Sequence, residues 1–310
     1  MRIATWNVNS IRSRIDRVEA LLQRREIDVL ALQETKAREE QIPLMGLHSL
    51  GYDVAAAGYN QWNGVAVISR VGIQDVTVGF PGMPEWGEPD AVAEARAIGA
   101  SCGGVRIWSL YVPNGRKVDD PHYLYKLDWL ARLREAASDW REAPVALVGD
   151  WNIAPQDDDV YDMAAFAKDT HVTPSERAAF QAFLDDGWTD VVRPHAPGPN
   201  VFTYWDYYRQ RFERNRGMRI DFVLGSPSFA RRVTGASIDR DERAGTGASD
   251  HAPVIVDLDY RPRAIRAGRR PLPAGAGVGW VVRPAGGAAA PLSALGAASR
   301  ATPVGGAVHD

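Results

Sequence analysis

Short apolar segments that end in polar residues alternate with helix-like segments over residues 1–260, and this pattern limits the fold more than any other feature. The segment 143–155, APVALVGDWNIAP, is the clearest case. Its continuous apolar run is typical of a central strand that is covered on both faces. Asp150 and Asn152 follow the run two positions apart, so their side chains point to the same side. They either cap a turn or belong to a polar site, because a buried carboxylate and a buried carboxamide need partners.

The alternation favours a sandwich of two β-sheets with helices outside, and the mixed order of the segments argues against a purely parallel sheet. Strand-like segments are expected at residues 2–8, 28–34, 64–70, 105–113, 144–152, 219–225 and 251–260. Amphipathic helices are expected at residues 13–25, 123–140 and 175–187. Their apolar faces carry Ile15, Val18, Leu21 and Leu22 in the first and Leu124, Leu127, Leu130 and Leu133 in the second. Ser175 is a candidate N-cap of the third.

The composition is ordinary for a soluble globular enzyme, and the net charge of −3 gives no general attraction to nucleic acid. Any surface that binds a polyanion must therefore be local. Cys102 is the only cysteine, which excludes an intramolecular disulfide and fits a reducing cytoplasm. Its small and apolar sequence neighbours predict a packed thiol and not a nucleophile. No apolar segment approaches the length of a membrane span, so we expect no membrane partner.

Residues 261–310 differ in composition from everything before them. Ala, Gly and Pro make up 28 of these 50 residues, and seven arginines against one acidic residue give the segment a charge of +6. Such a segment cannot bury enough apolar surface to offset its ordering entropy. We therefore predict one folded domain over residues 1–260 and a disordered Ala/Gly/Pro/Arg-rich tail over residues 261–310. The charge would suit loose contact with nucleic acid, but a solvated passenger segment is the favoured interpretation.

Polar side chains that suit acid–base or metal chemistry stand at six of the predicted strand ends. They are Asn7 and Asn9, Glu34, Tyr111 and Asn114, Asp150 and Asn152, Asp221, and Asp250 with His251. Each one alone can be explained as a cap, a turn residue or a structural Asp–His pair. A carboxylate, carboxamide, phenol or imidazole at six separate strand ends instead predicts one polar site at the mouth of the sandwich.

The residue types in this set indicate a particular chemistry. Glu34, Asp150 and Asp250, with Asn7 and Asn152, offer hard oxygen ligands that suit Mg²⁺ or Mn²⁺ and not zinc. The sequence has neither a phosphate-binding P-loop nor a dinucleotide-binding glycine pattern. Oxygen ligands together with one imidazole and one phenol match the metal-assisted hydrolysis of a phosphate ester.

Seven motifs in order resemble those of the exonuclease III family of AP endonucleases, within the endonuclease/exonuclease/phosphatase superfamily. They are TWNVNSIR, LQETK, WNGVAVISR, LYVPNG, GDWNIAP, NRGMRIDFVL and SDHAPV, and the similarity runs from Met1 to about Tyr260. The resemblance implies a four-layer α/β sandwich, in which two mixed β-sheets pack face to face with helices outside. It also implies that the folded domain at residues 1–260 is the catalytic domain.

The resemblance implies roles for individual residues. Glu34 is similar to the main Mg²⁺ ligand, and the set expected around the metal is Asn7, Glu34, Asp150, Asn152, Asp250 and His251. Asp150 would orient the attacking water or exchange a proton, and Asn152 would stabilise the transition state. His251, oriented by Asp221, would contact the scissile phosphate, while Tyr111 would donate to the phosphate or the leaving group. Asn9 stands where some members carry Asp, which leaves a second metal position open.

The segment 202–219, FTYWDYYRQRFERNRGMR, combines aromatic residues with arginines. Arginines can hold phosphates, and aromatic rings can fill the space of a missing base. Alone, the segment would be a packed loop with solvated arginines, but it resembles the loop that lines the family's abasic pocket. The residues expected to contact DNA are Asn114, Tyr204, Trp205, Arg216 and Arg219.

The resemblance therefore implies a Mg²⁺-dependent AP endonuclease, in which Mn²⁺ can substitute, with 3′→5′ exodeoxyribonuclease and 3′-end-cleaning activity. Its expected substrate is double-stranded DNA with abasic sites or blocked 3′ ends, and we expect a cytoplasmic monomer. Two alternatives remain at this point. One is a superfamily relative that hydrolyses a phospholipid or an inositol phosphate, and the other is a DNA-binding protein with a decayed catalytic site.

Overall fold

Two β-sheets packed face to face form the centre of the molecule in the computed structural model, which describes residues 1–87, 91–260 and 280–281. The first sheet contains β1 (Arg2–Asn7), β2 (Val29–Gln33), β3 (Asp53–Ala57), β4 (Val65–Ser69), β11 (Val233–Ile238), β12 (Val254–Leu258) and β13 (Trp280–Val281). The second contains β5 (Gln74–Val78), β6 (Ala97–Cys102), β7 (Val105–Tyr111), β8 (Val145–Asp150), β9 (Thr189–Asp190) and β10 (Asp221–Gly225). Both sheets mix parallel and antiparallel pairs, as predicted.

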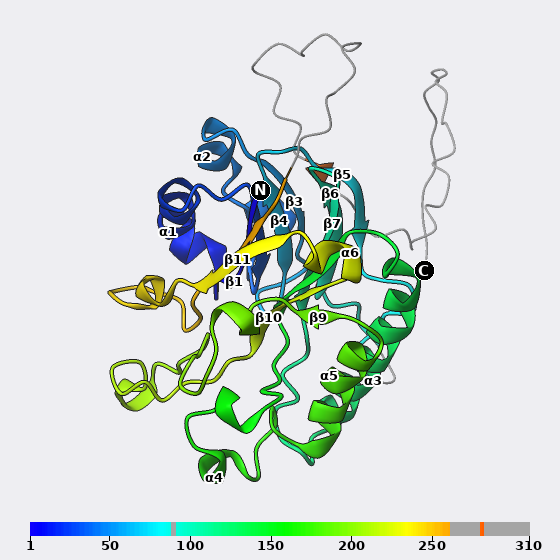
Figure 1. Cartoon of the computed structure of the whole chain (residues 1–310). Coiled ribbons are helices and arrows are strands. Elements are labelled where there is room, and N and C mark those ends of the chain that lie inside the picture. Colours follow the sequence, from blue (N-terminus) through cyan, green and yellow to red (C-terminus); the bar gives the residue numbers. More distant parts are fainter. Residues whose placement is uncertain (88–90, 261–279, 282–310) are drawn as a thin grey trace, which may run out of the picture.

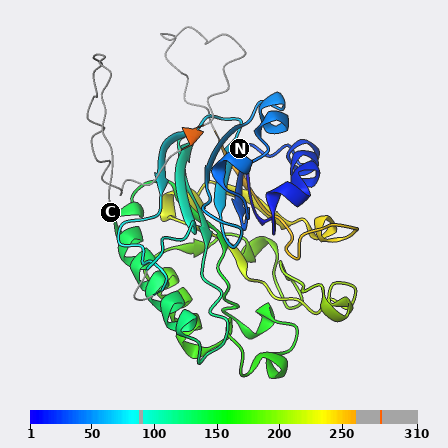
Figure 2. The same ribbon diagram turned by 180° about the vertical axis from the view of Figure 1, so that it is seen from behind.

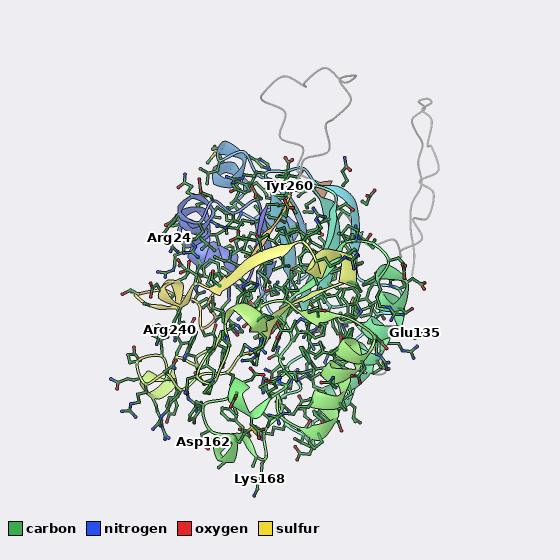
Figure 3. All side chains as sticks on the ribbon, viewed as in Figure 1. Arg24, Glu135, Asp162, Lys168, Arg240 and Tyr260 are labelled. Carbon is green, nitrogen blue, oxygen red and sulfur yellow. The ribbon has the colours of Figure 1, made fainter. Side chains whose placement is uncertain are left out.

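Helices surround the two sheets, and four of them cover the outer faces. They are α1 (Ile11–Arg24), α2 (Leu44–Ser49), α3 (Pro121–Ala137), α4 (Met163–Phe166), α5 (Pro174–Asp185) and α6 (Pro227–Ala230). Short 3₁₀ helices lie at η1 (Glu39–Gln41), η2 (Ser138–Trp140), η3 (Asp157–Asp159), η4 (Arg193–His195), η5 (Tyr208–Gln210) and η6 (Arg240–Arg243). Figure 1 shows α1 and α2 on one side of the sheets and α3 and α5 on the other, and Figure 2 shows the same layers from behind. Arg24 and Glu135 accordingly lie on opposite sides of the molecule (Figure 3).

Three apolar layers hold this arrangement together. One cluster lies between the sheets and joins residues of β1, β2 and β4 to residues of β7, β8 and β10. A second packs α1 and α2 on the outer face of the first sheet, and a third packs α3 and α5 on the outer face of the second. Burying these side chains supplies the main driving force for folding. The predicted four-layer α/β sandwich is confirmed.

The helix predictions were right in position but needed two corrections. Leu124 is not on the buried face of α3, because its side chain is 68% exposed while Tyr125, Trp129 and Leu130 face the sheet. The N-cap of α5 is Thr173 and not Ser175. The Thr173 side chain accepts from a backbone N–H two positions beyond Pro174, which occupies the first helical position, where its missing N–H costs nothing.

The predicted tail, residues 261–310, lies almost entirely outside the described residues. Within it the structure describes one pair of residues, β13, which runs parallel to β3 at the edge of the first sheet. The prediction of a tail without secondary structure did not anticipate this pairing. An edge strand offers unpaired backbone donors and acceptors to such an addition. None of the helices in the described part of the chain has the length and apolar character needed to cross a membrane.

Candidate active site

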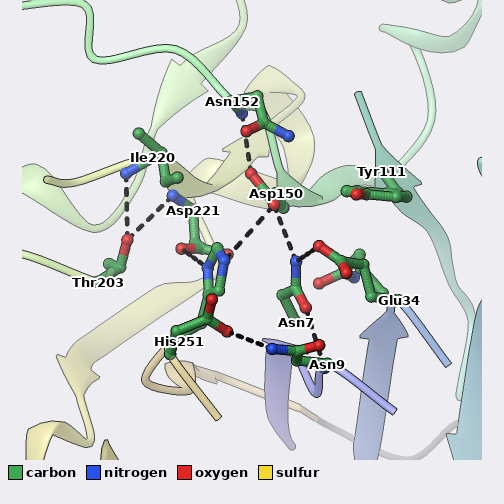
Figure 4. Close-up of polar contacts among 12 residues, drawn as sticks. Asn7, Asn9, Glu34, Tyr111, Asp150, Asn152, Thr203, Ile220, Asp221 and His251 are labelled. Atoms are coloured by element: carbon green, nitrogen blue, oxygen red, sulfur yellow. Dashed lines mark hydrogen bonds and ion pairs between the residues drawn. The ribbon is translucent and has the colours of Figure 1, made fainter. Parts of the chain in front are cut away.

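Strand register brings the polar strand ends together. Across the second sheet, Asp150 at the end of β8 stands beside Tyr111 of β7 on one side and Asp221 of β10 on the other. In the first sheet, Asn7 ends β1 beside the last residue of β2, so Glu34 follows at the same edge. Because the two sheets pack face to face, these edges meet at one end of the sandwich, as the close-up in Figure 4 shows.

The backbone at this edge is unusual and depends on the residue types present. Gly149 has a φ of 144°, and a Cβ added there would lie 2.0 Å from the carbonyl oxygen of Leu110, so only glycine fits beside Asp150. Non-glycine residues of the site also have positive φ, among them Glu34 at 50°, Asn152 at 50° and His171 at 84°. Such sparsely populated conformations persist where the surroundings over-determine them, and they concentrate at functional sites.

The Asn7 amide connects the two sheets at the centre of the site. Its Nδ2 donates to Glu34 Oε1 at 2.8 Å and to Asp150 Oδ2 at 2.9 Å. Lys36 lies on the other side of Glu34, with its ammonium 2.9 Å from Oε2. Lys36 and the Asn7 amide hold the pKa of Glu34 below its ordinary value, although burial opposes them. Glu34 is therefore an anion with oxygens directed at the centre of the site.

His251 lies between two carboxylates. Its Nδ1 donates to Asp221 Oδ2 at 2.9 Å, and its Nε2 lies 3.8 Å from Asp150 Oδ2. Burial disfavours a charged imidazole, but Asp221 and Asp150 outweigh it and raise the pKa of His251 to about 10. Burial, reinforced by Asp221 and Glu34 against His251, raises the pKa of Asp150 to about 7. The site thus places the His251 imidazolium beside the Asp150 carboxyl group, which gains or loses its proton near neutral pH.

The donor set fits a hard divalent cation. Asp150 and Asp221 lie in one buried cluster with His251, within 4.8 Å of one another, and the two carboxylates are its oxygen ligands because a protonated imidazole offers no lone pair. Asp221 Oδ1 is buried and has no hydrogen-bond partner among the residues that the structure describes. Burial raises the pKa of Asp150, with smaller contributions from Asp221 and Glu34, and a bound cation would favour the charged carboxylate. Glu34 and Asn7 add further oxygens at the same edge, which agrees with a preference for Mg²⁺ or Mn²⁺.

Two further predicted residues stand at the borders of this centre. Burial and the neighbouring Glu34 carboxylate raise the pKa of Tyr111 well above its ordinary value, so its hydroxyl remains a donor. The Oδ1 atom of Asp250 accepts from Asn9 Nδ2 at 3.0 Å. Lys36 also donates to Asn9 Oδ1 at 2.6 Å. Asn9 therefore joins Asp250 to the Glu34 side of the site.

A cavity of about 170 Å³ opens onto this centre. It is lined by Glu34, Tyr111, Asn114, Asp150, Asn152, His171, Tyr204, Met218, Ile220, Asp250 and His251. Isolated β-bridges hold Tyr204 to Met218 and to His251, and the Tyr204 ring lies 4.9 Å from the imidazole of His251. Tyr204, Met218 and Ile220 thus form an apolar side of the cavity that faces the charged groups.

The side chains of Asn114, Asn152 and His171 form another part of the cavity lining, here called the polar wall. Asn114 Nδ2 donates to Asn152 Oδ1 at 3.0 Å and lies 3.3 Å from His171 Nε2. His171 Nδ1 lies 2.7 Å from the carbonyl of Thr170, so the neutral ring carries its proton there and accepts at Nε2. Burial lowers the pKa of His171 to about 4, which keeps the ring neutral. Asn152 Nδ2 donates to Val112 O at 2.9 Å, and within the described part of the chain its second N–H has no acceptor and can serve a ligand.

Two residues predicted to contact DNA are in the protein interior. Trp205 is 1% exposed, packs with Phe202 and does not line the cavity. Arg219 is 2% exposed, and its guanidinium pairs with Asp159 and Asp190, each at 2.7 Å. Both residues therefore have structural roles in place of the predicted contact with DNA. Side chains alternate in direction along extended backbone, so Trp205 points away from the cavity that Tyr204 lines, and Arg219 points away from the cavity that Met218 and Ile220 line.

The same alternation identifies two residues that the sequence reasoning missed. Met218 and Ile220, on either side of Arg219, point together into the cavity. Their alternation with a charged residue in the segment GMRIDF is a signal that was available. His171 was also missed, and its loop carries no comparable pattern.

A loop with aromatic and basic residues, residues 206–216, lies beside the cavity and is here called the exposed loop. The side chains of Tyr207 and Tyr208 are 52% and 57% exposed. Tyr207 is connected to the site, because its hydroxyl lies 3.4 Å from Asn9 Nδ2. Arg216 is exposed at the end of the loop, as the sequence predicted for a residue that contacts DNA. Its position is compatible with phosphate contact, which remains a prediction.

Comparison with known proteins agrees with this geometry. Residues 4–251 match the Endonuclease/Exonuclease/phosphatase family. The chain is 31% identical to exodeoxyribonuclease III of Haemophilus influenzae over 272 residues, which cover 83% of this chain and 100% of that protein. A 3′ phosphatase from Neisseria, solved with a product DNA hairpin, is 38% identical with a TM-score of 0.79 and covers 84% of this chain and 100% of its own. An AP endonuclease from Archaeoglobus fulgidus is 34% identical with a TM-score of 0.78, over 84% and 99%.

Proposed function

The chain belongs to the endonuclease/exonuclease/phosphatase family, and on that premise we propose that it uses Mg²⁺ to cut duplex DNA 5′ to abasic sites and to process 3′ ends. It is a DNA-repair nuclease of the exodeoxyribonuclease III and AP endonuclease type, a phosphodiester hydrolase. The observation that carries the finer proposal is the convergence of Asp150, His251 and Glu34 on one cavity. An intact set of this kind does not support a decayed site, and the nuclease relatives do not support a lipid substrate.

Glu34 and Asn7 would hold the metal, with Asp150 and Asp250 close enough to contribute to its surroundings. When bound, the cation supplies Lewis-acid polarisation of a phosphoryl oxygen. Mn²⁺ offers the same preference for oxygen and is expected to substitute. The family as a whole is metal-dependent, and the identity of the ion is part of the proposal.

The residues of this chain would divide the remaining work. Asp150, with a pKa near 7, accepts the proton of the attacking water. His251 is protonated at neutral pH, and Asp221 fixes its ring so that the positive Nε2 side faces a non-bridging phosphate oxygen. Asn152 donates its free N–H to the same developing charge, and Tyr111 donates its hydroxyl.

The apolar side of the cavity would receive the sugar of the damaged nucleotide. An intact nucleotide would have to leave the base stack first, which costs a few kcal/mol and is cheapest at a lesion. Arg216 and the exposed loop that precedes it would contact the DNA backbone. We also propose that the protein acts as a monomer in the cytoplasm.

The test uses the purified full chain and two duplexes, one with a single abasic analogue and one with a 3′-phosphate at a nick. With Mg²⁺ we expect incision 5′ to the analogue, leaving a 3′-hydroxyl, and removal of the 3′-phosphate. Excess chelator should stop both reactions, and Mn²⁺ should restore them. Undiminished cleavage in chelator would contradict the metal proposal, and cleavage of neither duplex would contradict the proposed substrates.

A further inference from the structure

Behind the polar wall lies an ion pair that has no contact with solvent. Lys126 on α3 and Glu176 on α5 pair directly, and both side chains are 0% exposed. Burial lowers the pKa of Lys126, although Glu176 opposes the shift. Buried pairs of this kind are often no more stabilising than well-packed apolar residues of similar volume. Fold stability alone therefore does not account for a lysine at a position that an apolar residue of similar volume could fill.

The Lys126 ammonium uses its donors on the backbone that carries the wall. Nζ donates to the carbonyl of Asn152 at 2.6 Å, and the carbonyl of Asn114 lies at 3.4 Å. These two carbonyls belong to the segments that follow β8 and β7, so one cation ties both segments to α3. With Glu176 as the third partner, the three N–H donors of the ammonium are all engaged.

Glu176 extends the same network to the third member of the wall. Its Oε1 accepts from the backbone N–H of His171 at 2.9 Å. Its Oε2 accepts from the N–H and the hydroxyl of Thr173, at 3.1 and 2.7 Å, and so completes the cap of α5. The Glu176 carboxylate thus holds both Thr173, at the start of α5, and the backbone of His171, which has positive φ.

We propose that Lys126 and Glu176 are positioning residues, a buried pair that holds the backbones of Asn114, Asn152 and His171 and so sets where the polar wall meets the scissile phosphate. Asn152 and His171 both have positive φ, which requires support from the surroundings. The Asn152 N–H assists only if it lies within a fraction of an ångström of its place, because a misplacement of about 1 Å can cost roughly 100-fold in rate. This inference rests on the function proposed above for Asn152.

The test compares Lys126→Met and Glu176→Gln with a matched control, Leu133→Ala. Met keeps the length of Lys126 without its charge, and Gln keeps the shape of Glu176 but can serve fewer donors. Leu133 is on the same helix, is 0% exposed and has no polar group, so its truncation destabilises α3 without touching the wall. All assays run at a temperature below the melting point of every variant, with Mg²⁺ and both duplexes.

We expect Lys126→Met and Glu176→Gln to lower kcat about 10- to 100-fold on both duplexes, with KM and DNA affinity within about threefold of wild type. Leu133→Ala should keep kcat within about threefold. A second readout needs no turnover. In protein labelled with ¹⁵N at its eight asparagines, the side-chain amide signals of Asn114 and Asn152 should move in both test variants and not in the control.

Equal kcat in test and control variants, with unmoved amide signals, would overturn the inference. If Lys126→Met does not fold, Glu176→Gln decides it alone. The two proposals fail in different ways. Loss of the proposed function would appear as wild-type protein that cuts neither duplex, whereas the amide signals report the positions of Asn114 and Asn152 without any substrate.

Discussion

The centre and the rim of the cavity are built differently. The central residues Asn7, Asp150 and Asp221 are strand residues whose neighbours are set by sheet register. The rim is made by segments between strands, which carry the polar wall and the exposed loop up to Arg216. A strand packed on both faces moves little, so it suits groups that must hold water and phosphate in register. Loops suit groups that recognise the DNA, because they can vary without disturbing the core.

The largest effect should come from the centre. Asp150→Asn removes the group that accepts the proton, and kcat should fall about 10²- to 10⁴-fold on the abasic duplex. DNA binding should remain, because the loop that we propose contacts the DNA backbone is untouched. The measurement is single-turnover cleavage beside a binding assay in chelator, with circular dichroism to confirm the fold. Near-normal turnover would show that another group activates the water.

The sequence predicted the centre well because its information is local. An apolar run specifies a buried strand, and the polar residue that ends the run is then placed at the sheet edge. Residues in this class, such as Asp150 and Asn7, needed only the correct strand. The edge strands β5 and β9 were missed because half-exposed or very short segments carry weak patterns. The buried strands β3 and β6 were also missed, because they consist mostly of small residues such as alanine and glycine, which are not typical of strands.

The sequence predicted the rim less well because its residues depend on tertiary contacts. Trp205 and Arg219 have residue types common in DNA contacts, but the fold buries one among aromatic rings and the other in an ion-pair network. His171 enters the cavity because Glu176, five residues later, fixes its backbone. A lysine within a helix, such as Lys126, is expected from sequence to face solvent. Only the packing of α3 on α5 shows that Lys126 is buried.

A second effect should appear in the pH dependence of stability. The folded-state pKa of His251 is about 10, above the ordinary value of 6.5. Protonation therefore stabilises the fold fully below pH 6.5, and this contribution is lost as the pH rises through 10. In metal-free protein, His251→Asn should thus lower the melting temperature most at pH 6 and least at pH 10. Melting curves in chelator across this range measure it.

Asp150 must be controlled in that experiment, because its raised pKa also makes the folded state less stable as the pH rises through about 7. Repeating the series in an Asp150→Asn background removes this coupled group. A melting difference that does not shrink with rising pH in either background would mean that His251 is not charged in the folded centre.

The smallest effect should come from the rim, and it distinguishes an arginine that contacts DNA from one that holds the fold. Arg216→Ala removes an exposed cation whose guanidinium lies 5.8 Å from the centroid of the Tyr161 ring, so the melting temperature should change little. If Arg216 contacts one phosphate, the slope of log affinity against log salt should become shallower by about 0.9. The measurement is abasic-duplex affinity in chelator at several salt concentrations.

Arg219→Met is the matched comparison, because Arg219 is only three residues away but its guanidinium is paired with Asp159 and Asp190. Removing it takes from Asp190 the ion pair with Arg219 and leaves Asp159 with Arg193 as its remaining arginine, which should cost about 3 kcal/mol in the free energy of unfolding. The salt slope should equal that of wild type. Arg219 is 2% exposed, so it cannot reach a phosphate and displace a counterion from DNA. The two variants should therefore have opposite effects. Arg216→Ala should change the salt slope with little effect on stability, and Arg219→Met should lower stability without changing the salt slope. If Arg219→Met changed the slope, the buried arginine would have to reach DNA, and the division between a rigid centre and a recognising rim would not hold at this position.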